Sequence, residues 1–237
     1  MHWISGAVTD RGRVRQVNQD AFLDRPDLGI WAVADGMGGH SDGALASRLL
    51  VEGLGALPRP RLLGRGARAA IEVVRTVNRA LIAQAQTAGS DLIGSTLVAL
   101  LAVGEQCAIL WVGDSRIYRL RDGALRQLTT DHSQVQALID AGLLAPELSE
   151  AHPLSNVLLR AVGGEEALSV DRRIERLRPG DRYLLCSDGL FRELDAGAMA
   201  AILSAAPPAE AARDLVERAC AHGARDNVTA LVVQVAE

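Results

Sequence analysis

Apolar residues recur along the chain in two different spacings, and the spacing predicts which segments are strands and which are helices. Short alternating or wholly apolar runs predict strands over residues 3–9, 21–23, 30–34, 95–103, 107–112, 116–120, 124–128, 169–174, 182–186 and 228–235. Apolar residues at helical spacing predict helices over residues 43–57, 65–86, 134–141, 195–203 and 210–222. Ser41 or Asp42 can cap the first of these helices, and Pro58 and Pro60 follow its end.

The order of these segments predicts the class of fold. Strands come first, then two long helices, then many strands, two further helices and a last strand. Alternating strand–helix–strand units would give a different order, so we expect an α+β fold of stacked antiparallel sheets with helices outside. The four runs between residues 95 and 128 are separated by Gly or Asp-Gly turns and predict one antiparallel meander. Residues 142–154 are weakly patterned and predict a mobile loop.

Composition shows that this fold has ample material for a core. Of the 237 residues, 49% are hydrophobic but only 3% are aromatic, so we expect a core of Leu, Val, Ile and Ala. The longest strongly apolar run, residues 97–103, is far shorter than the ~20 residues that a membrane span needs. The first residues have neither the charged nor the apolar region of a signal peptide, so we expect a cytoplasmic protein with no membrane partner.

The charge balance and the cysteines narrow the possible partners. The 25 basic and 29 acidic residues leave a net charge of −4, which gives no argument for nucleic acid as a partner. Cys107, Cys186 and Cys220 have no metal-ligand spacing and cannot all pair. We therefore expect them to be reduced core residues.

Aspartates stand at the ends of predicted strands that lie far apart in the sequence: Asp35, Asp114, Asp188 and Asp226. The glycines after Asp35 let the backbone approach a bound group closely. A single Asp-Gly pair is typical of an ordinary turn. Four carboxylates at strand ends instead predict a site for hard cations that the fold assembles.

Six short motifs follow one another along the chain: Arg15-x-x-Asn18-Gln19-Asp20, Asp35-Gly36-Met37-Gly38-Gly39, Gly94-Ser95-Thr96, Gly113-Asp114-Ser115-Arg116, Ser187-Asp188-Gly189 and Asp226-Asn227-Val228-Thr229. In this order they resemble the bacterial branch of the metal-dependent protein serine/threonine phosphatases, the type 2C (PPM) family. Each motif alone is a weak signal, but together they span residues 10–229. The resemblance implies one domain over residues 1–237, built as a four-layer α/β/β/α sandwich with a mobile flap at about residues 133–162.

The resemblance also implies a chemistry. Two divalent cations, Mn²⁺ or Mg²⁺, would lie between the sheets. Asp35 would bridge both ions, the carbonyl of Gly36 would hold one, and Asp188 and Asp226 would complete the ligand set. A water or hydroxide shared by the ions would attack phosphoserine or phosphothreonine without a phosphoenzyme.

Further residues have roles that the resemblance implies. Arg15 would clamp the phosphoryl group with its guanidinium. Asp20 would orient metal-bound waters. Asp114, together with Asp188, would hold a third, weaker ion. Asn156 either lies near that third site or caps a helix or strand.

Two positions depart from the family pattern. Gln19 stands where many relatives have Glu, and a neutral amide cannot supply the charge of that carboxylate to an outer ligand role. Met37 stands where eukaryotic relatives have a His that is proposed as the general acid, and a thioether cannot donate a proton. His40 is either an alternative proton donor or a packing residue. His132 and His152 are expected at the surface near the loop.

Three functions compete on this evidence. The first is a monomeric phosphatase that acts on phosphorylated proteins and opposes a bacterial Ser/Thr kinase. The second is a non-catalytic binding module, which predicts loss of ligand residues that are all intact here. The third is a hydrolase of small phosphate esters or nucleotides, although the chain has no glycine-rich nucleotide loop of the Walker type.

Overall fold

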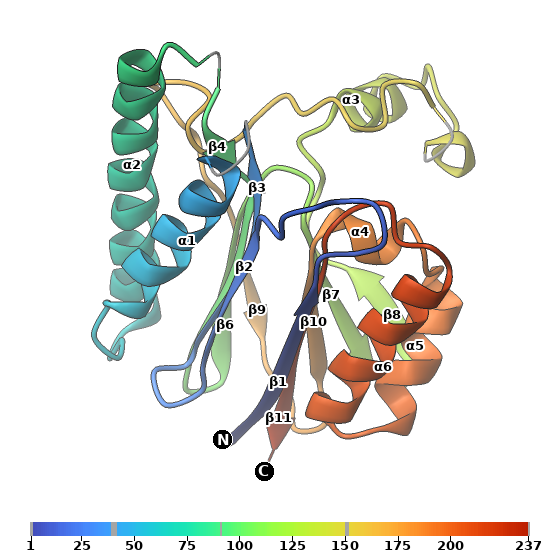
Figure 1. Cartoon of the computed structure of the whole chain (residues 1–237). Helices are drawn as coiled ribbons and strands as arrows, with labels where there is room; N and C mark the ends of the chain where they lie inside the picture. The colour runs from blue at the N-terminus through green and yellow to red at the C-terminus, as the bar shows by residue number, and fades with distance from the viewer. Residues whose placement is uncertain (1, 39–41, 91, 150–151, 237) are drawn as a thin grey trace.

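The computed structural model describes residues 2–38, 42–90, 92–149 and 152–236, and within these ranges two antiparallel sheets pack face to face (Figure 1). The first sheet has the strand order β1 (His2–Asp10), β11 (Val228–Ala236), β10 (Arg182–Cys186), β7 (Arg116–Arg121) and β8 (Ala124–Gln127). The second has the order β2 (Asp20–Arg25), β3 (Ile30–Met37), β5 (Leu97–Val103), β6 (Gln106–Val112) and β9 (Asp171–Arg176). The short strand β4 (Gly94–Ser95) pairs with β3.

Helices cover the outer face of each sheet. The second sheet carries α1 (Asp42–Gly55) and α2 (Leu63–Ala88), and the first carries α5 (Ala196–Ala205) and α6 (Pro208–Ala221) (Figure 1). The apolar stripe predicted for residues 65–86 is the buried side of α2. The predicted four-layer α+β sandwich is therefore confirmed.

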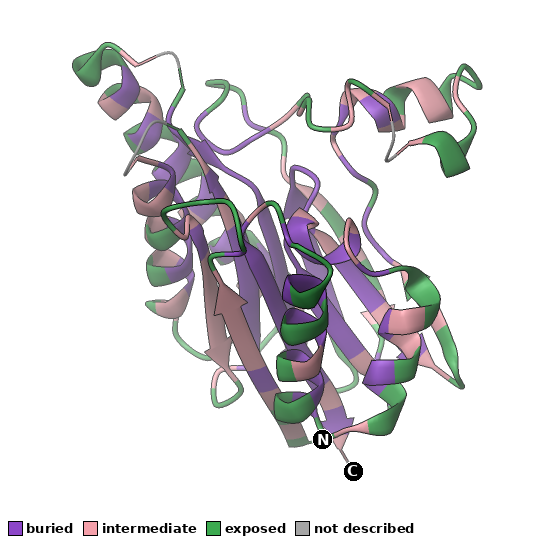
Figure 2. Cartoon of the chain, turned by 45° about the vertical axis from the view of Figure 1, so that its right-hand side comes forward, coloured by how far each residue is buried: buried purple, intermediate pink, exposed green. Residues whose placement is uncertain are grey.

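Strand alternation divides the apolar residues between three cores. Along β3, Ala32 and Ala34 face the helix layer, while Trp31 and Val33 face the other sheet. Burial of a large apolar side chain stabilises the fold by about 1.5–3 kcal/mol, so both faces of this strand contribute. Figure 2 shows the buried colour along the strands, while the helices carry both buried and exposed residues. The three cysteines are free and buried within these cores.

One expectation about the sheets is wrong. The four runs between residues 95 and 128 do not form one meander, because β5 and β6 pair in one sheet and β7 and β8 in the other. Residues 113–115 carry the chain across. Gly113 makes this crossing with a φ of 98°, and a side chain there would lie 2.7 Å from Cγ2 of Thr96. The crossing places Asp114 between the sheets.

The described residues of the segment 133–162, which is the segment predicted as the flap, project from the body of the molecule (Figure 1). This segment carries α3 (Gln134–Asp140) and a short 3₁₀ turn, Pro146–Leu148. Ser133 near its start bridges Leu158 near its end, and its last residue, Val162, is held to the body by a bridge to Ser95. The mobility of the segment stays a prediction. Over the described ranges, no helix combines the length and the apolarity that a membrane crossing requires.

Candidate active site

Two of the predicted acids are paired across neighbouring strands. Asp20 begins β2 and lies directly opposite Asp35 of β3. By strand alternation, Asp35 shares the inter-sheet face with Trp31 and Val33. The two carboxyl groups therefore stand at one end of the core between the sheets.

The backbone of Asp35 is fixed by the Gly94-Ser95-Thr96 motif. The Asp35 N–H donates to Oγ1 of Thr96 at 3.0 Å, and the Asp35 carbonyl accepts from Oγ of Ser95 at 2.9 Å. Thr96 also shares a 2.7 Å hydroxyl–hydroxyl hydrogen bond with Ser115. Since Ser115 lies beside the crossing to the other sheet, this motif ties Asp35 to both sheets.

The other sheet brings its acids to the same end. Asp188 begins α4 (Asp188–Phe191), a short helix directly after β10 that the sequence pattern did not predict. Asp226 lies just before β11, which pairs with β10. Oγ of Ser187 and Oγ1 of Thr229 donate to Oδ2 of Asp20 at 2.7 and 2.6 Å, so these side chains join the two sheets at the site. Sequence reasoning gave no role to Ser187 or Thr229.

Burial and mutual repulsion change the acidity of this cluster. Burial raises the pKa of Asp35 well above its ordinary value, and the charges of Asp20 and Asp188 raise it further. Burial raises the pKa of Asp20 to about 7, although hydrogen bonds from Thr229 and Ser187 oppose the shift. Burial also raises the pKa of Asp188. A nearby positive charge would stabilise all three groups in their ionised form.

Arg15 and Asp226 form a bidentate ion pair. Nε of Arg15 donates to Oδ1 of Asp226 at 2.9 Å, and Nη2 donates to Oδ2 at 2.7 Å. The loop that carries Arg15 is held by Asn227, whose side chain accepts from the N–H of Gln19 and donates to the carbonyls of Arg11 and Val17. The Arg15 side chain is 58% exposed, so it can turn toward a phosphoryl group from a well-anchored loop.

Asp114 lies next to an arginine that the sequence pattern did not single out. Nη2 of Arg192 is 3.0 Å from Oδ2 of Asp188 and 3.9 Å from Oδ2 of Asp114. Burial raises the pKa of Asp114 to about 7, and the guanidinium of Arg192 opposes that shift. Asn156 accepts a hydrogen bond from Nη1 of Arg192, so it reaches the Asp114 region through this arginine.

The chemistry of the cluster suits a pair of hard cations. Oδ1 of Asp20 and Oδ1 of Asp188 are buried and have no hydrogen-bond partner in the described part of the chain. A buried carboxylate oxygen without a partner is costly, and oxygen ligands are those that Mn²⁺ and Mg²⁺ prefer. As the side chains stand, no three acidic, His or Cys residues among those described form a complete ion-binding group, and Asp226 faces Arg15 instead. The cluster thus offers the oxygen donors that two hard cations prefer, with Asp226 paired to Arg15 in this arrangement.

Four positions discussed from the sequence have different outcomes. His132 is not a surface residue: its side chain is 10% exposed, and its Nδ1 accepts from the Gly113 N–H at 3.0 Å. His152 is half-buried within the projecting segment. Met37 ends β3, and His40 lies outside the described residues.

Comparison with known proteins decides the family. A model of the family described as Protein phosphatase 2C matches residues 9–217. The chain belongs to the protein phosphatase 2C family. Serine/threonine protein phosphatase PstP of Mycobacterium tuberculosis (strain ATCC 25618 / H37Rv) is 39% identical over 233 residues. The match covers 98% of this chain but 45% of PstP, so the chain spans less than half the length of this relative.

Solved structures match the whole fold. PppA, described as a key regulatory component of T6SS in Pseudomonas aeruginosa, has a TM-score of 0.93 at 41% identity, with 99% of this chain and 98% of PppA covered. The catalytic domain of PstP in complex with two manganese ions has a TM-score of 0.88 at 36% identity, with 99% of each chain covered. The two-ion centre of that domain accords with the orphaned carboxylate oxygens seen here.

Proposed function

We propose that this protein phosphatase 2C family member hydrolyses phosphoserine and phosphothreonine on proteins and uses two divalent cations, Mn²⁺ or Mg²⁺. One observation carries the proposal: the buried acids of both sheets meet with orphaned oxygens at the end of the inter-sheet core. The ligands would be the carboxylates of Asp35, Asp188 and Asp226 and the carbonyl of Gly36. When bound, the cations supply a Lewis-acid centre that ionises water near neutral pH and offsets phosphoryl charge.

The chain's own residues bind and orient the reacting groups. Arg15 leaves Asp226 and donates two N–H groups to phosphoryl oxygens, which offsets the charge that builds up during transfer. Asp20 is held by Ser187 and Thr229 and orients water through its free Oδ1. Water supplies the hydroxyl to phosphorus. Because Met37 has no proton to donate, the second proton of that water passes through solvent to the serine or threonine oxygen.

A cleft beside the acids gives the substrate room. It has a volume of about 530 Å³, and its lining includes Arg15, Asn156, Arg225 and Asp226. A cleft of this size takes a phosphorylated side chain with its neighbouring residues. We propose that the projecting segment 133–162 is a mobile flap over this cleft, and that residues 1–237 form one catalytic domain.

The biological setting follows from the same chemistry. A phosphoprotein substrate requires a kinase, so we propose that the enzyme opposes a Ser/Thr kinase with which it shares substrates. We further propose that it acts as a monomer in the cytoplasm and that neither nucleic acid nor a membrane is its partner.

Hydrolysis of p-nitrophenyl phosphate and of a phosphothreonine peptide tests the function. Activity should require Mn²⁺ or Mg²⁺ and disappear in EDTA. Asp35→Asn and Asp188→Asn should abolish turnover of both substrates, while circular dichroism shows an intact fold. The exposed Asp122, at the turn between β7 and β8, provides a matched Asp122→Asn control that should retain activity. Turnover that persists in EDTA would refute the proposal.

A further inference from the structure

Arg192 is the one cation that contacts both Asp188 and Asp114 among the ion pairs of the described residues. It follows α4 directly, and its N–H donates to the carbonyl of Asp188 at 3.1 Å. This places its side chain one helical turn from Asp188, on the same side. The helix therefore brings the Arg192 side chain within reach of Asp188.

The two oxygens of Asp188 have different surroundings. Oδ2 is 3.0 Å from Nη2 of Arg192, whereas Oδ1 is buried and without a hydrogen-bond partner in the described ranges. Oδ1 therefore remains available to the two proposed cations. Oδ2 is already paired with a positive charge that also lies 3.9 Å from Oδ2 of Asp114.

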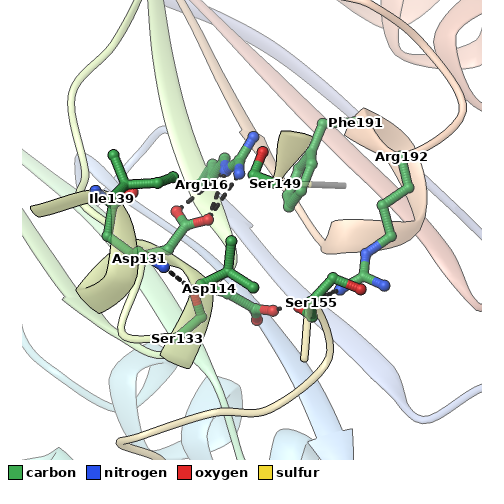
Figure 3. Close-up of a pocket in the computed structure, with 11 residues that line it drawn as sticks. Asp114, Arg116, Asp131, Ser133, Ile139, Ser149, Ser155, Phe191 and Arg192 are labelled. Carbon is green, nitrogen blue, oxygen red and sulfur yellow. Dashed lines mark hydrogen bonds and ion pairs between the residues drawn. The ribbon is translucent and has the colours of Figure 1, made fainter. Parts of the chain in front are cut away.

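The same guanidinium reaches the projecting segment. Nη2 donates to the carbonyl of Ser155 at 3.2 Å, and Nη1 donates to Oδ1 of Asn156. Figure 3 shows Arg192 extending from α4 toward Ser155, with Asp114 nearby in the same pocket. Three parts of the chain thus meet at one side chain: α4, the crossing between the sheets and the projecting segment.

We propose that Arg192 takes the place of a third cation at Asp114 and Asp188, and that it ties the segment around Ser155 to the catalytic acids. A divalent ion at this position would lie against a fixed positive charge, so Asp114 does not hold an ion in this chain. This inference rests on the proposed two-ion function. Its consequence is that the position of the segment near Ser155 does not depend on the concentration of a weakly bound ion.

Counting bound Mn²⁺ tests the first half of the inference. Calorimetric titration of chelator-stripped protein should give two ions for the wild type and for Arg192→Lys, which keeps the charge. Arg192→Met should bind three ions, and the double variant Arg192→Met with Asp114→Asn should return to two. Three ions in the wild type, or two in a folded Arg192→Met, would overturn the inference.

Hydrogen exchange in the presence of chelator tests the second half. In Arg192→Met, the amides of Ser155 and Val157 should exchange about tenfold faster than in the wild type, because the segment loses its hydrogen bonds to a charged group. The amide of Ala102, which lies in β5 of the other sheet and donates to the carbonyl of Gly29, should be unchanged. Unchanged exchange at Ser155 and Val157 would refute the tether.

The two levels of the proposal fail separately. If the wild type binds no divalent ion and hydrolyses no phosphate ester, the proposed function fails, while the exchange experiment still tests the tether. If the wild type is an active two-ion enzyme but Arg192→Met gains no ion, only the inference about Arg192 fails.

Discussion

Replacement of Asp20 by asparagine should change how the metal-free protein responds to pH. Burial raises the pKa of Asp20 from 3.8 to about 7 in the folded protein. The folded form therefore binds this proton more tightly than the unfolded chain does. The stability that the protonated Asp20 contributes is fully present below about pH 4 and is lost as the pH rises through about 7.

The size of the effect follows from the shift. One pKa unit corresponds to about 1.36 kcal/mol, so Asp20 accounts for roughly 4 kcal/mol of lost stability between about pH 4 and 7. About 2 kcal/mol of this loss falls between about pH 5.5 and 7. Asparagine has the same shape, its carbonyl can still accept from Ser187 and Thr229, and it carries no charge. Between about pH 5.5 and 7, the free energy of unfolding of Asp20→Asn should therefore fall by about 2 kcal/mol less than that of the wild type.

Urea denaturation in excess EDTA measures this difference. Unfolding can be followed by tryptophan fluorescence, since Trp31 is buried, and by circular dichroism at both pH values. Asp122→Asn, at an exposed turn, is the control and should follow the wild type. Equal pH dependence for the wild type and Asp20→Asn would show that the buried carboxyl is not the source of the effect.

Three further predictions concern the catalytic machinery. Arg15→Ala should lower kcat/KM for a phosphopeptide by about 10²-fold, because the phosphoryl group loses its guanidinium contacts. Mn²⁺ binding, measured by calorimetry, should not weaken, because the Arg15–Asp226 ion pair competes with the metal ion. Weaker Mn²⁺ binding in this variant would contradict the prediction. Gly36→Ala should abolish activity and reduce stability, because the added Cβ would overlap the Gly43 carbonyl and lie 2.8 Å from the Gln19 carbonyl oxygen. Gly64→Ala is the control in the activity and melting assays, because a Cβ at Gly64 has no neighbour within 4 Å. Mn²⁺ should raise the melting temperature more at pH 8 than at pH 5.5, since protons compete for the acids that burial makes weaker; an equal rise at both pH values would contradict the proposed ligands.

Local patterns were sufficient to predict most helices and strands. The apolar stripe of α2 and the runs that became β3, β6 and β10 report their own periodicity, and periodicity is a property of neighbouring residues. The same patterns placed acids at strand ends. The meander failed because a turn signal such as Gly113-Asp114 marks a change of direction but does not say which sheet the chain enters next.

The layer order, the oxygen-rich character of the site and the family resemblance can all be read from the chain, because they depend on residue types and their spacing. The folded structure was needed to show that Ser187 and Thr229 hold Asp20, that His132 is buried, and that Arg192 faces Asp114. These contacts join residues from separate strands, helices and loops. The packing of the two sheets decides which polar residues meet. No local sequence pattern carries that information.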